Sequence, residues 1–216
     1  MSADSNAPTL RRRYEDRFRS DLERFFRRLS DAATDGGFHV DTFLAALEGI
    51  VFSVGKATAT AFGERVYAQL TGRSLAMASL RFDADLMDNW IAAVAANTAD
   101  SIIDATAEGF DEAFASGDPE MVTDYAEGLV SVRSGIYAVS LVTTFANFGA
   151  NDGARAAEAG RKTWLTTSSN PRESHAAIGG ETVALDERFS NGLLWPGDPA
   201  GPAEELANCV CALEFA

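Results

Sequence analysis

The sequence contains little cysteine, histidine and positive charge, and each shortage narrows its possible functions. Two cysteines in 216 residues cannot form a disulfide framework, and they suit a reducing compartment. With 18 basic against 32 acidic residues the net charge is −14. This charge argues against a general nucleic-acid-binding protein, because phosphate neutralisation needs clustered Lys and Arg. One of the two histidines and both cysteines follow residue 160, so we expect any specific chemistry there.

Long apolar runs are also missing. The first forty residues are dense in charge and contain no apolar run of signal length, so we expect no secretory signal. The longest apolar stretches, residues 43–54 and 136–148, are too short to cross a bilayer. We therefore predict that both are buried helix and that the protein has no membrane partner.

Residues 8–160 instead show the periodicity of helices. Apolar side chains recur at steps of three and four residues, which predicts four long antiparallel helices. Their expected ranges are about 10–29, 43–70, 85–114 and 121–160. The residue pairs Gly36-Gly37 and Thr71-Gly72 are expected to end the first two helices, and Asp41 to cap the second.

Local signals also predict details of the third and fourth helices. The third should start near Asp83 or Asp85. The fourth should open at Asp118, because an aspartate cap is followed there by proline, a favoured first-turn residue. We expect this helix to break near Gly149 before an Ala-rich run.

After Gly160 the apolar period changes from near four to two. Residues 162–168 alternate like a half-buried strand, and residues 182–185 and 209–215 are further strand candidates. Single helical turns are expected at residues 171–178 and after Glu204 and Glu205. The predicted fold class is therefore α+β. Long antiparallel helices form a body over residues 1–160, and residues 161–216 form a small C-terminal α+β unit with a short sheet.

His175, Cys209 and Cys211 are potential ligands of a soft metal ion. Cys-x-Cys on a strand would place both sulfurs on one face, but the usual Cys-x2-Cys spacing is missing. A fourth ligand would have to come from Asp186, Asp198 or a second chain. We therefore predict no metal and no cofactor: His175 donates a hydrogen bond to the backbone, and both thiols pack as small apolar groups. Zinc and a strained disulfide between the two cysteines are the alternatives.

Patterns of known catalytic sites are missing. A zinc-dependent nucleobase deaminase needs His-x-Glu, but Ala177 stands two residues after His175. The sequence has neither a Gly-x-Ser-x-Gly elbow nor a Gly-x4-Gly-Lys-Ser/Thr phosphate loop. Ser174 beside His175 in sequence does not create a triad. We predict that the protein is not an enzyme.

The C-terminal unit does carry an ordered series of motifs. A tryptophan-containing strand is followed by Arg-x-x-His, a glycine pair, a phenylalanine, Pro-Gly-Asp-Pro, an acidic pair and Asn-Cys-x-Cys. This series resembles the phage head-morphogenesis domain of the Mu F-like minor head proteins over about residues 160–215. The resemblance is carried by Trp164, Arg172, His175, Gly180, Phe189, Pro196, Gly197, Asp198, Pro199, Asn208, Cys209 and Cys211. That family usually has Arg where this chain has Val210, so a contact made through that Arg is not expected here.

The resemblance implies a non-enzymatic minor capsid protein that associates with the phage portal protein and the capsid interior. It would be located in the virion, and in the host cytoplasm during assembly. It would also accompany DNA during packaging or ejection. The alternatives are a metal-stabilised protein-binding or effector module and, less favoured, a deaminase-like zinc enzyme.

The first predicted helix is basic, and its surface is a candidate for the contact with DNA or the portal that the resemblance implies. Residues 1–28 hold eight arginines and five acidic residues, a net charge of +3, while the rest of the chain carries −17. Most of these arginines lie off the apolar stripe, where they could contact double-stranded DNA or an acidic groove on the portal. The candidates are Arg11, Arg12, Arg13, Arg17, Arg24, Arg27 and Arg28. The alternative is the solvated face of an ordinary core helix.

Overall fold

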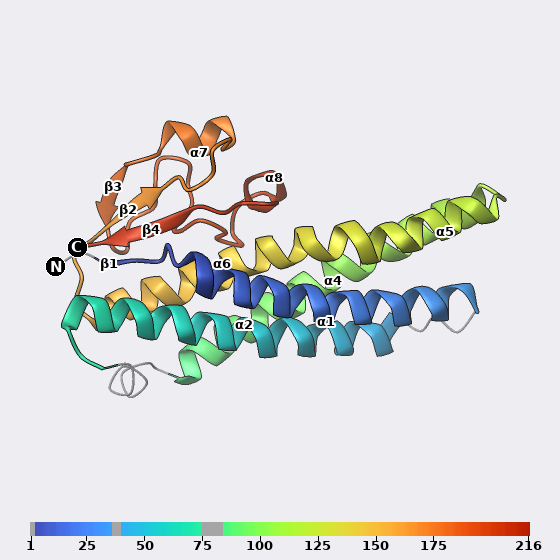
Figure 1. Cartoon of the computed structure of the whole chain (residues 1–216), viewed down its shortest axis with the longest axis horizontal. Coiled ribbons are helices and arrows are strands. Elements are labelled where there is room, and N and C mark those ends of the chain that lie inside the picture. Colours follow the sequence, from blue (N-terminus) through green and yellow to red (C-terminus); the bar gives the residue numbers. More distant parts are fainter. Residues whose placement is uncertain (1–2, 36–39, 75–83) are drawn as a thin grey trace.

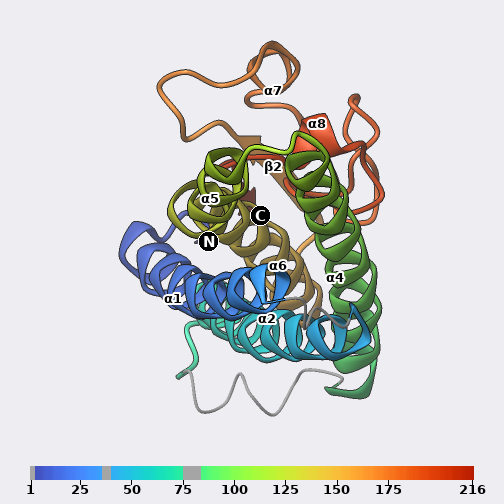
Figure 2. The same ribbon diagram turned by 90° about the vertical axis from the view of Figure 1, so that its right-hand side faces the viewer.

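The computed structural model describes residues 3–35, 40–74 and 84–216. Long helices run antiparallel along the molecule, and a small sheet unit lies against one side of them near one end (Figure 1). Viewed from the other end of the molecule, this unit lies on the side of α4 and α6 that is opposite α1 and α2 (Figure 2). The helical segments of the body are α1 (Pro8–Thr34), α2 (Val40–Thr71), α4 (Ala84–Ala115), α5 (Pro119–Gly128), the π-helical turn η1 (Leu129–Arg133) and α6 (Ser134–Ala156).

The sheet unit contains short helices and an antiparallel sheet. Its elements are β1 (Ala3–Asp4), β2 (Arg161–Leu165), α7 (Glu173–Ala177), β3 (Thr182–Ala184), α8 (Ala203–Leu206) and β4 (Ala212–Phe215). The strand order is β1-β4-β2-β3. Trp164 of β2 pairs with Leu213 of β4, and Phe215 pairs with both Lys162 and Ala3. The predicted α+β class, with long helices and a short sheet, is confirmed.

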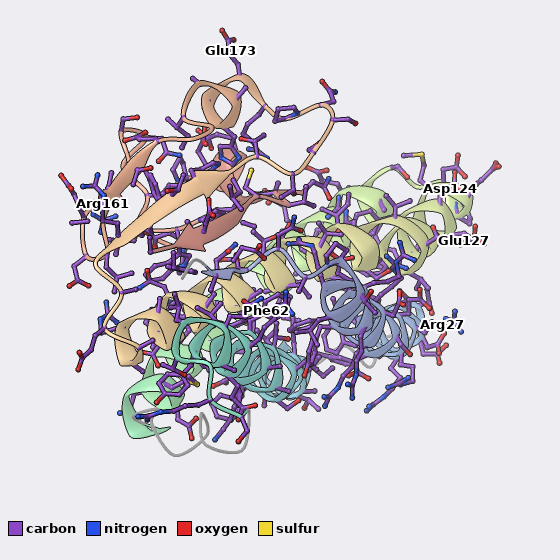
Figure 3. The ribbon with its side chains drawn as sticks, turned by 60° about the vertical axis from the view of Figure 1, so that its left-hand side comes forward. Arg27, Phe62, Asp124, Glu127, Arg161 and Glu173 are labelled. Atoms are coloured by element: carbon purple, nitrogen blue, oxygen red, sulfur yellow. The ribbon has the colours of Figure 1, made fainter. Side chains whose placement is uncertain are left out.

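The apolar stripe predicted for the first helix is also confirmed. Phe18, Leu22, Phe26 and Leu29 of α1 are fully buried against the other long helices. Phe62 of α2 points into the same core (Figure 3). Asp118 caps α5 as predicted, accepting a hydrogen bond from the Glu120 backbone N–H at 2.9 Å. Gly36 and Gly37, Asp83, and the side chains of Asp41 and Asp85 lie outside the described part of the chain.

The predicted break at Gly149 is wrong. Helix α6 continues through this residue, and the irregular turn of that helical column is η1, sixteen or more residues earlier. A Cβ atom at Gly149 would lie 2.0 Å from the Ala59 carbonyl oxygen, and one at Gly153 would lie 2.2 Å from that of Gly63. Both glycines therefore allow α6 to approach the α2 backbone closely. In a sequence, a glycine that permits a close helix contact looks the same as one that breaks a helix.

Two helical segments are longer than the apolar stretches seen in the sequence. Residues Thr42–Thr71 and Pro119–Ala156 are long and apolar enough to cross a membrane by length and composition. In this fold α2 and α6, which belong to these segments, pack against each other inside the helical body.

The sequence did not predict β1, and it placed the start of the last strand too early. That strand was expected to begin at Cys209, but β4 begins at Ala212. The backbone carbonyls of Cys209 and Cys211 are hydrogen-bonded to side chains of the helical body instead of a neighbouring strand. Cys-x-Cys therefore lies outside the sheet, directly before β4.

A second apolar core joins the sheet unit to the helices. Trp164, Phe189 and Phe215 of the unit pack with Val66 of α2 and Ala150 of α6. Between the two parts, the Asn147 side-chain amide donates to the carbonyls of Thr143, Pro196 and Cys211, each at 3.1 Å. Its oxygen accepts from the Ser5 hydroxyl at 2.7 Å. Asn147 thus ties α6 to three separate segments of the chain.

Candidate functional site

The structure brings the imidazole of His175 and the thiols of Cys209 and Cys211 together inside the sheet unit. His175 Nδ1 lies 3.6 Å from Cys209 Sγ and 3.5 Å from Cys211 Sγ. The three potential ligand atoms lie within 4.8 Å of one another. All three residues are 2–3% exposed, and both cysteines are free thiols. We refer to them as the His-Cys-Cys cluster.

Helix α7 and its flanking residues position the imidazole. The helix starts after Arg172, whose guanidinium donates to the Ala207 carbonyl and so ties α7 to the segment that follows α8. Thr166 donates from its hydroxyl to the His175 carbonyl at 3.2 Å. The short helix is therefore anchored on both sides, and the His175 ring points inward from it.

The helical body positions the two thiols through their backbone. The Cys209 carbonyl accepts hydrogen bonds from the Thr143 hydroxyl and, at 3.4 Å, from the Arg11 guanidinium. Just before it, Asn208 adopts a left-handed backbone conformation (φ 54°), which Asn tolerates better than most residues. Its backbone N–H donates to the Ser140 hydroxyl at 3.0 Å. These contacts fix the segment from which both sulfurs project.

Glu205 occupies the outer side of the imidazole. Its Oε2 lies 2.8 Å from His175 Nε2, at ion-pair distance but off the direction of a well-formed hydrogen bond. The Ser174 hydroxyl donates to both carboxylate oxygens, at 3.0 and 3.1 Å. The ring nitrogens of His175 therefore face two thiols and a carboxylate, so the predicted backbone hydrogen bond is wrong. The sequence indicated Glu205 as part of an acidic pair in the motif series and as the start of a helical turn, but no spacing rule links it to His175.

The close contact perturbs the acidity of the two thiols in opposite directions. The pKa of Cys211 is lowered, chiefly because Cys209 donates a hydrogen bond to its sulfur; His175 and the Trp164 indole N–H also favour the thiolate. The pKa of Cys209 is raised because its proton is held in that hydrogen bond and because the thiol is buried. The two buried thiols therefore differ in acidity.

Aromatic rings enclose the cluster and lead to a buried lysine. The Trp164 ring lies edge-to-face with His175 at 5.0 Å and with Phe189 at 5.2 Å between centroids. Lys162 Nζ lies 5.6 Å from the Phe189 ring centroid and donates to the Leu185 carbonyl at 2.6 Å. Burial lowers the pKa of Lys162 to about 8.

The remaining motif residues shape loops around this core. Gly197 has a positive φ of 81°, and a Cβ there would lie 2.8 Å from the Thr144 backbone nitrogen, so the Pro-Gly-Asp-Pro loop packs directly on α6. Asp198 accepts hydrogen bonds from Leu194 N–H and Ala200 N–H, at 2.9 and 3.0 Å. The carboxylate of Asp198 therefore holds its own loop together.

Gly180 turns the chain between α7 and β3 with a φ of 87°.

Neither acid expected as a fourth metal ligand joins the cluster. Asp186 forms an ion pair with Arg155 at 2.6 Å, and Asp198 is also 3.3 Å from Arg188. Within the described residues the grouped ligand atoms are those of His175, Cys209 and Cys211 alone.

The candidate arginines of α1 differ in their surroundings. Arg11 is half-buried and bonded inward, to Glu15 at 2.6 Å and to the Val139 carbonyl at 3.2 Å. The exposed members of the set are Arg12, Arg13, Arg17, Arg24, Arg27 and Arg28. Of these, Arg24 pairs with Asp21 and Arg27 lies 3.9 Å from Glu23. Arg11 therefore serves the structure, while six arginines remain on the surface.

The site combines two soft sulfur ligands, an oriented imidazole and a carboxylate behind it in a buried volume. Such a group can bind a thiophilic metal ion or act as a redox-sensitive thiol pair. Comparisons with protein-family models, with curated proteins and with solved structures find no match to this chain.

Proposed function

We propose that the protein is a minor head protein of a double-stranded DNA phage and that it acts in head morphogenesis. The observation that supports this best is the placement of the residues that resemble the Mu F-like domain. Trp164, His175, Phe189, Cys209 and Cys211 are scattered over about fifty residues, yet they meet in one buried cluster. If the resemblance reflects the whole series of motifs and not a single motif, residues from the different motifs are expected to pack together.

The surface of α1 supports a contact with DNA or the portal. Arg13, Arg17, Arg24 and Arg28 recur at steps of four, seven and four residues, so they share one face of the helix. They span about 22 Å along the helix axis at 1.5 Å per residue. All four are exposed. A row of this length suits an extended row of phosphates or carboxylates, and we refer to it as the arginine row.

Negative charge elsewhere confines this contact to α1. Asp124 and Glu127 lie on α5, which extends toward the same end of the molecule as Arg27 of α1 (Figure 3). Carboxylates there repel phosphate, so DNA would follow the arginine row and would not wrap around the helical body.

Mass spectrometry of purified phage particles tests the proposal. Particles produced by the strain that encodes the chain are expected to contain peptides from residues 14–24 and 174–188 in amounts well below those of the major capsid protein. Particles from a strain with the gene deleted provide the control for co-purified host protein. Absence of these peptides from particles and from assembly intermediates would contradict the proposal.

The His-Cys-Cys cluster favours a second candidate, a metal-stabilised protein-binding module. This function requires a metal but no phage particle, so bound zinc in a protein that is absent from particles and assembly intermediates would favour it over the first.

A further inference from the structure

The distances within the His-Cys-Cys cluster match those of a metal site. In a tetrahedral zinc site with Zn–S of about 2.3 Å and Zn–N of about 2.0–2.1 Å, a nitrogen and a sulfur ligand lie roughly 3.5 Å apart. His175 Nδ1 lies 3.6 Å from one sulfur and 3.5 Å from the other. Both nitrogen–sulfur distances therefore match those of a tetrahedral zinc site, and the three ligand atoms lie within 4.8 Å of one another.

The orientation of the imidazole suits a metal bound at Nδ1. Both sulfurs lie near Nδ1, and Glu205 Oε2 lies 2.8 Å from the other ring nitrogen, Nε2. A neutral ring with its proton on Nε2 would present the lone pair of Nδ1 to the sulfurs. Metal-bound histidines commonly place a carboxylate behind the ring in this way. Ser174, which donates to both oxygens of Glu205, holds the carboxylate in turn.

The sulfurs are held in place without a metal. The helical body binds the Cys209 carbonyl through Thr143 and the Cys211 carbonyl through Asn147. Hydrogen bonds of this kind fix the direction of the ligands and tune their basicity.

Charge balance favours a divalent ion in this buried place. Two thiolates carry a charge of −2, which a buried site tolerates only when it is neutralised. A divalent cation bound by two thiolates and a neutral imidazole gives a neutral group. Binding breaks two S–H bonds, forms two metal–sulfur bonds and one metal–nitrogen bond, and releases two protons to solvent.

We propose that His175, Cys209 and Cys211 bind one zinc ion, with Glu205 orienting the imidazole and a water molecule completing the tetrahedron. Two sulfur ligands and one imidazole select zinc over magnesium or calcium, which prefer oxygen ligands. The ion would join α7 to the Cys-x-Cys segment and so stabilise the sheet unit. This proposal does not depend on a role in the phage head.

Elemental analysis of the full chain, produced without a histidine tag and desalted after exposure to Zn²⁺, tests the site. We expect about one zinc per chain, and loss of this zinc in the Cys209→Ser/Cys211→Ser double variant. Replacing Zn²⁺ by Co²⁺ is expected to give the visible absorption of a tetrahedral site together with sulfur-to-cobalt charge transfer. The spectrum reports on ligand type without relying on any activity.

A second variant covers the case in which loss of the thiols prevents folding. Glu205→Gln keeps all three ligands but weakens the orientation of His175, so we expect zinc affinity to fall about 10-fold to 100-fold in chelator competition. Glu204→Gln, at the exposed neighbouring residue, is the matched control and should leave affinity unchanged.

Three results would overturn the zinc site. The first is folded wild-type protein that binds no zinc and has two titratable thiols. The second is a mass lower by two hydrogens, which indicates a disulfide between Cys209 and Cys211. The third is zinc that the double cysteine variant still retains. Equal affinity in the Glu205→Gln and Glu204→Gln variants would contradict the role of Glu205 in orienting the imidazole.

Discussion

At the scale of single residues, Lys162 is the most unusual side chain of the sheet unit. It lies on β2 and is 1% exposed, yet its amine has only the Leu185 carbonyl as a hydrogen-bond acceptor among the described residues. The alternation of polar and apolar residues predicted a half-buried strand here. It could not indicate that Lys162 shares the buried face with Trp164. Periodicity shows only which residues lie on the same face of a strand, and a lysine is normally expected on a solvated face.

Replacing Lys162 with Met should change how stability depends on pH. Burial lowers the pKa of Lys162 from 10.5 in the unfolded chain to about 8 in the folded protein. Between these values the unfolded state binds more protons, so the wild type gains stability as pH rises. The free energy of unfolding of the wild type, relative to Lys162→Met, should therefore rise between pH 8 and 10.5 by at most about 1.4 kcal/mol per pH unit.

Urea unfolding at several pH values measures this difference. Lys56→Met serves as the control for the loss of a lysine, since the Lys56 side chain is 44% exposed and pairs with Asp88 at 2.6 Å. If the difference in free energy of unfolding between the wild type and Lys162→Met stays constant from pH 8 to 10.5, folding does not lower the pKa of Lys162, and the prediction is wrong.

The residues of the candidate site were predictable only in part. Sequence motifs placed His175, Cys209 and Cys211 in one C-terminal unit, but their spacing argued against a metal because it lacks Cys-x2-Cys. Their convergence depends on hydrogen bonds from Thr143 and Asn147, which belong to a helix far away in sequence. No local pattern reports such contacts.

At the scale of elements, the long helices followed directly from the sequence, whereas the smallest strand did not. The apolar stripe of α1 repeats over many turns, and neither a strand nor a loop produces a three-and-four-residue period of that length. β1 has two residues, Ala3 and Asp4, which is too few to show a period of two. It forms because the Leu213 backbone N–H and the Ser5 hydroxyl pair at 2.7 Å beside the edge of β4, a tertiary contact.

The close crossing of α2 and α6 gives a test of the observed packing. Gly149→Ala places a methyl group against the Ala59 carbonyl, where a Cβ would lie 2.0 Å away. We expect the free energy of unfolding to fall by about 1–3 kcal/mol, as for other overpacked cores. Denaturant midpoints at constant m-value measure the change.

Gly49→Ala is the matched control for this crossing. Gly49 lies on the exposed face of α2, and a Cβ there would meet no atom of the described chain within 4 Å. Alanine should raise stability by about 0.5–1 kcal/mol at this position because it favours helix. Equal stabilisation by both substitutions would mean that the two helices do not approach as closely as described.

At the scale of the whole molecule, side chains of the helical body and of the sheet unit pack in one common apolar core. Trp164 packs in the same cluster as Val66, Ala150 and Ala154, and Asn147 binds segments of both parts. The change of apolar period at Gly160 marks where helices give way to strands. It carries no information about β1, which brings the start of the chain into the sheet.

The contrast between the basic α1 and the acidic remainder of the molecule leads to a prediction about DNA binding. The Arg17→Gln/Arg28→Gln double variant removes two exposed members of the arginine row. If each contacts a phosphate, the slope of log affinity against log salt for a DNA duplex should become shallower by about two. Fluorescence anisotropy over a range of salt concentrations measures the slope.

The Arg73→Gln/Arg161→Gln variant is the control, because it makes the same change in net charge at two exposed positions away from α1. It should leave the slope nearly unchanged. Salt-independent binding by the wild type, or equal slopes for both double variants, would contradict a DNA contact through the arginine row.

The pairing of Ala3 with Phe215 brings the first and last strands, β1 and β4, side by side (Figure 1). A short flexible peptide could therefore join them, and new termini could be opened at the exposed turn that contains Gly117. Such a circular permutant would retain every contact between the helices and the sheet. It would also move a fluorescent label or fused domain to the opposite end of the molecule, away from the His-Cys-Cys cluster.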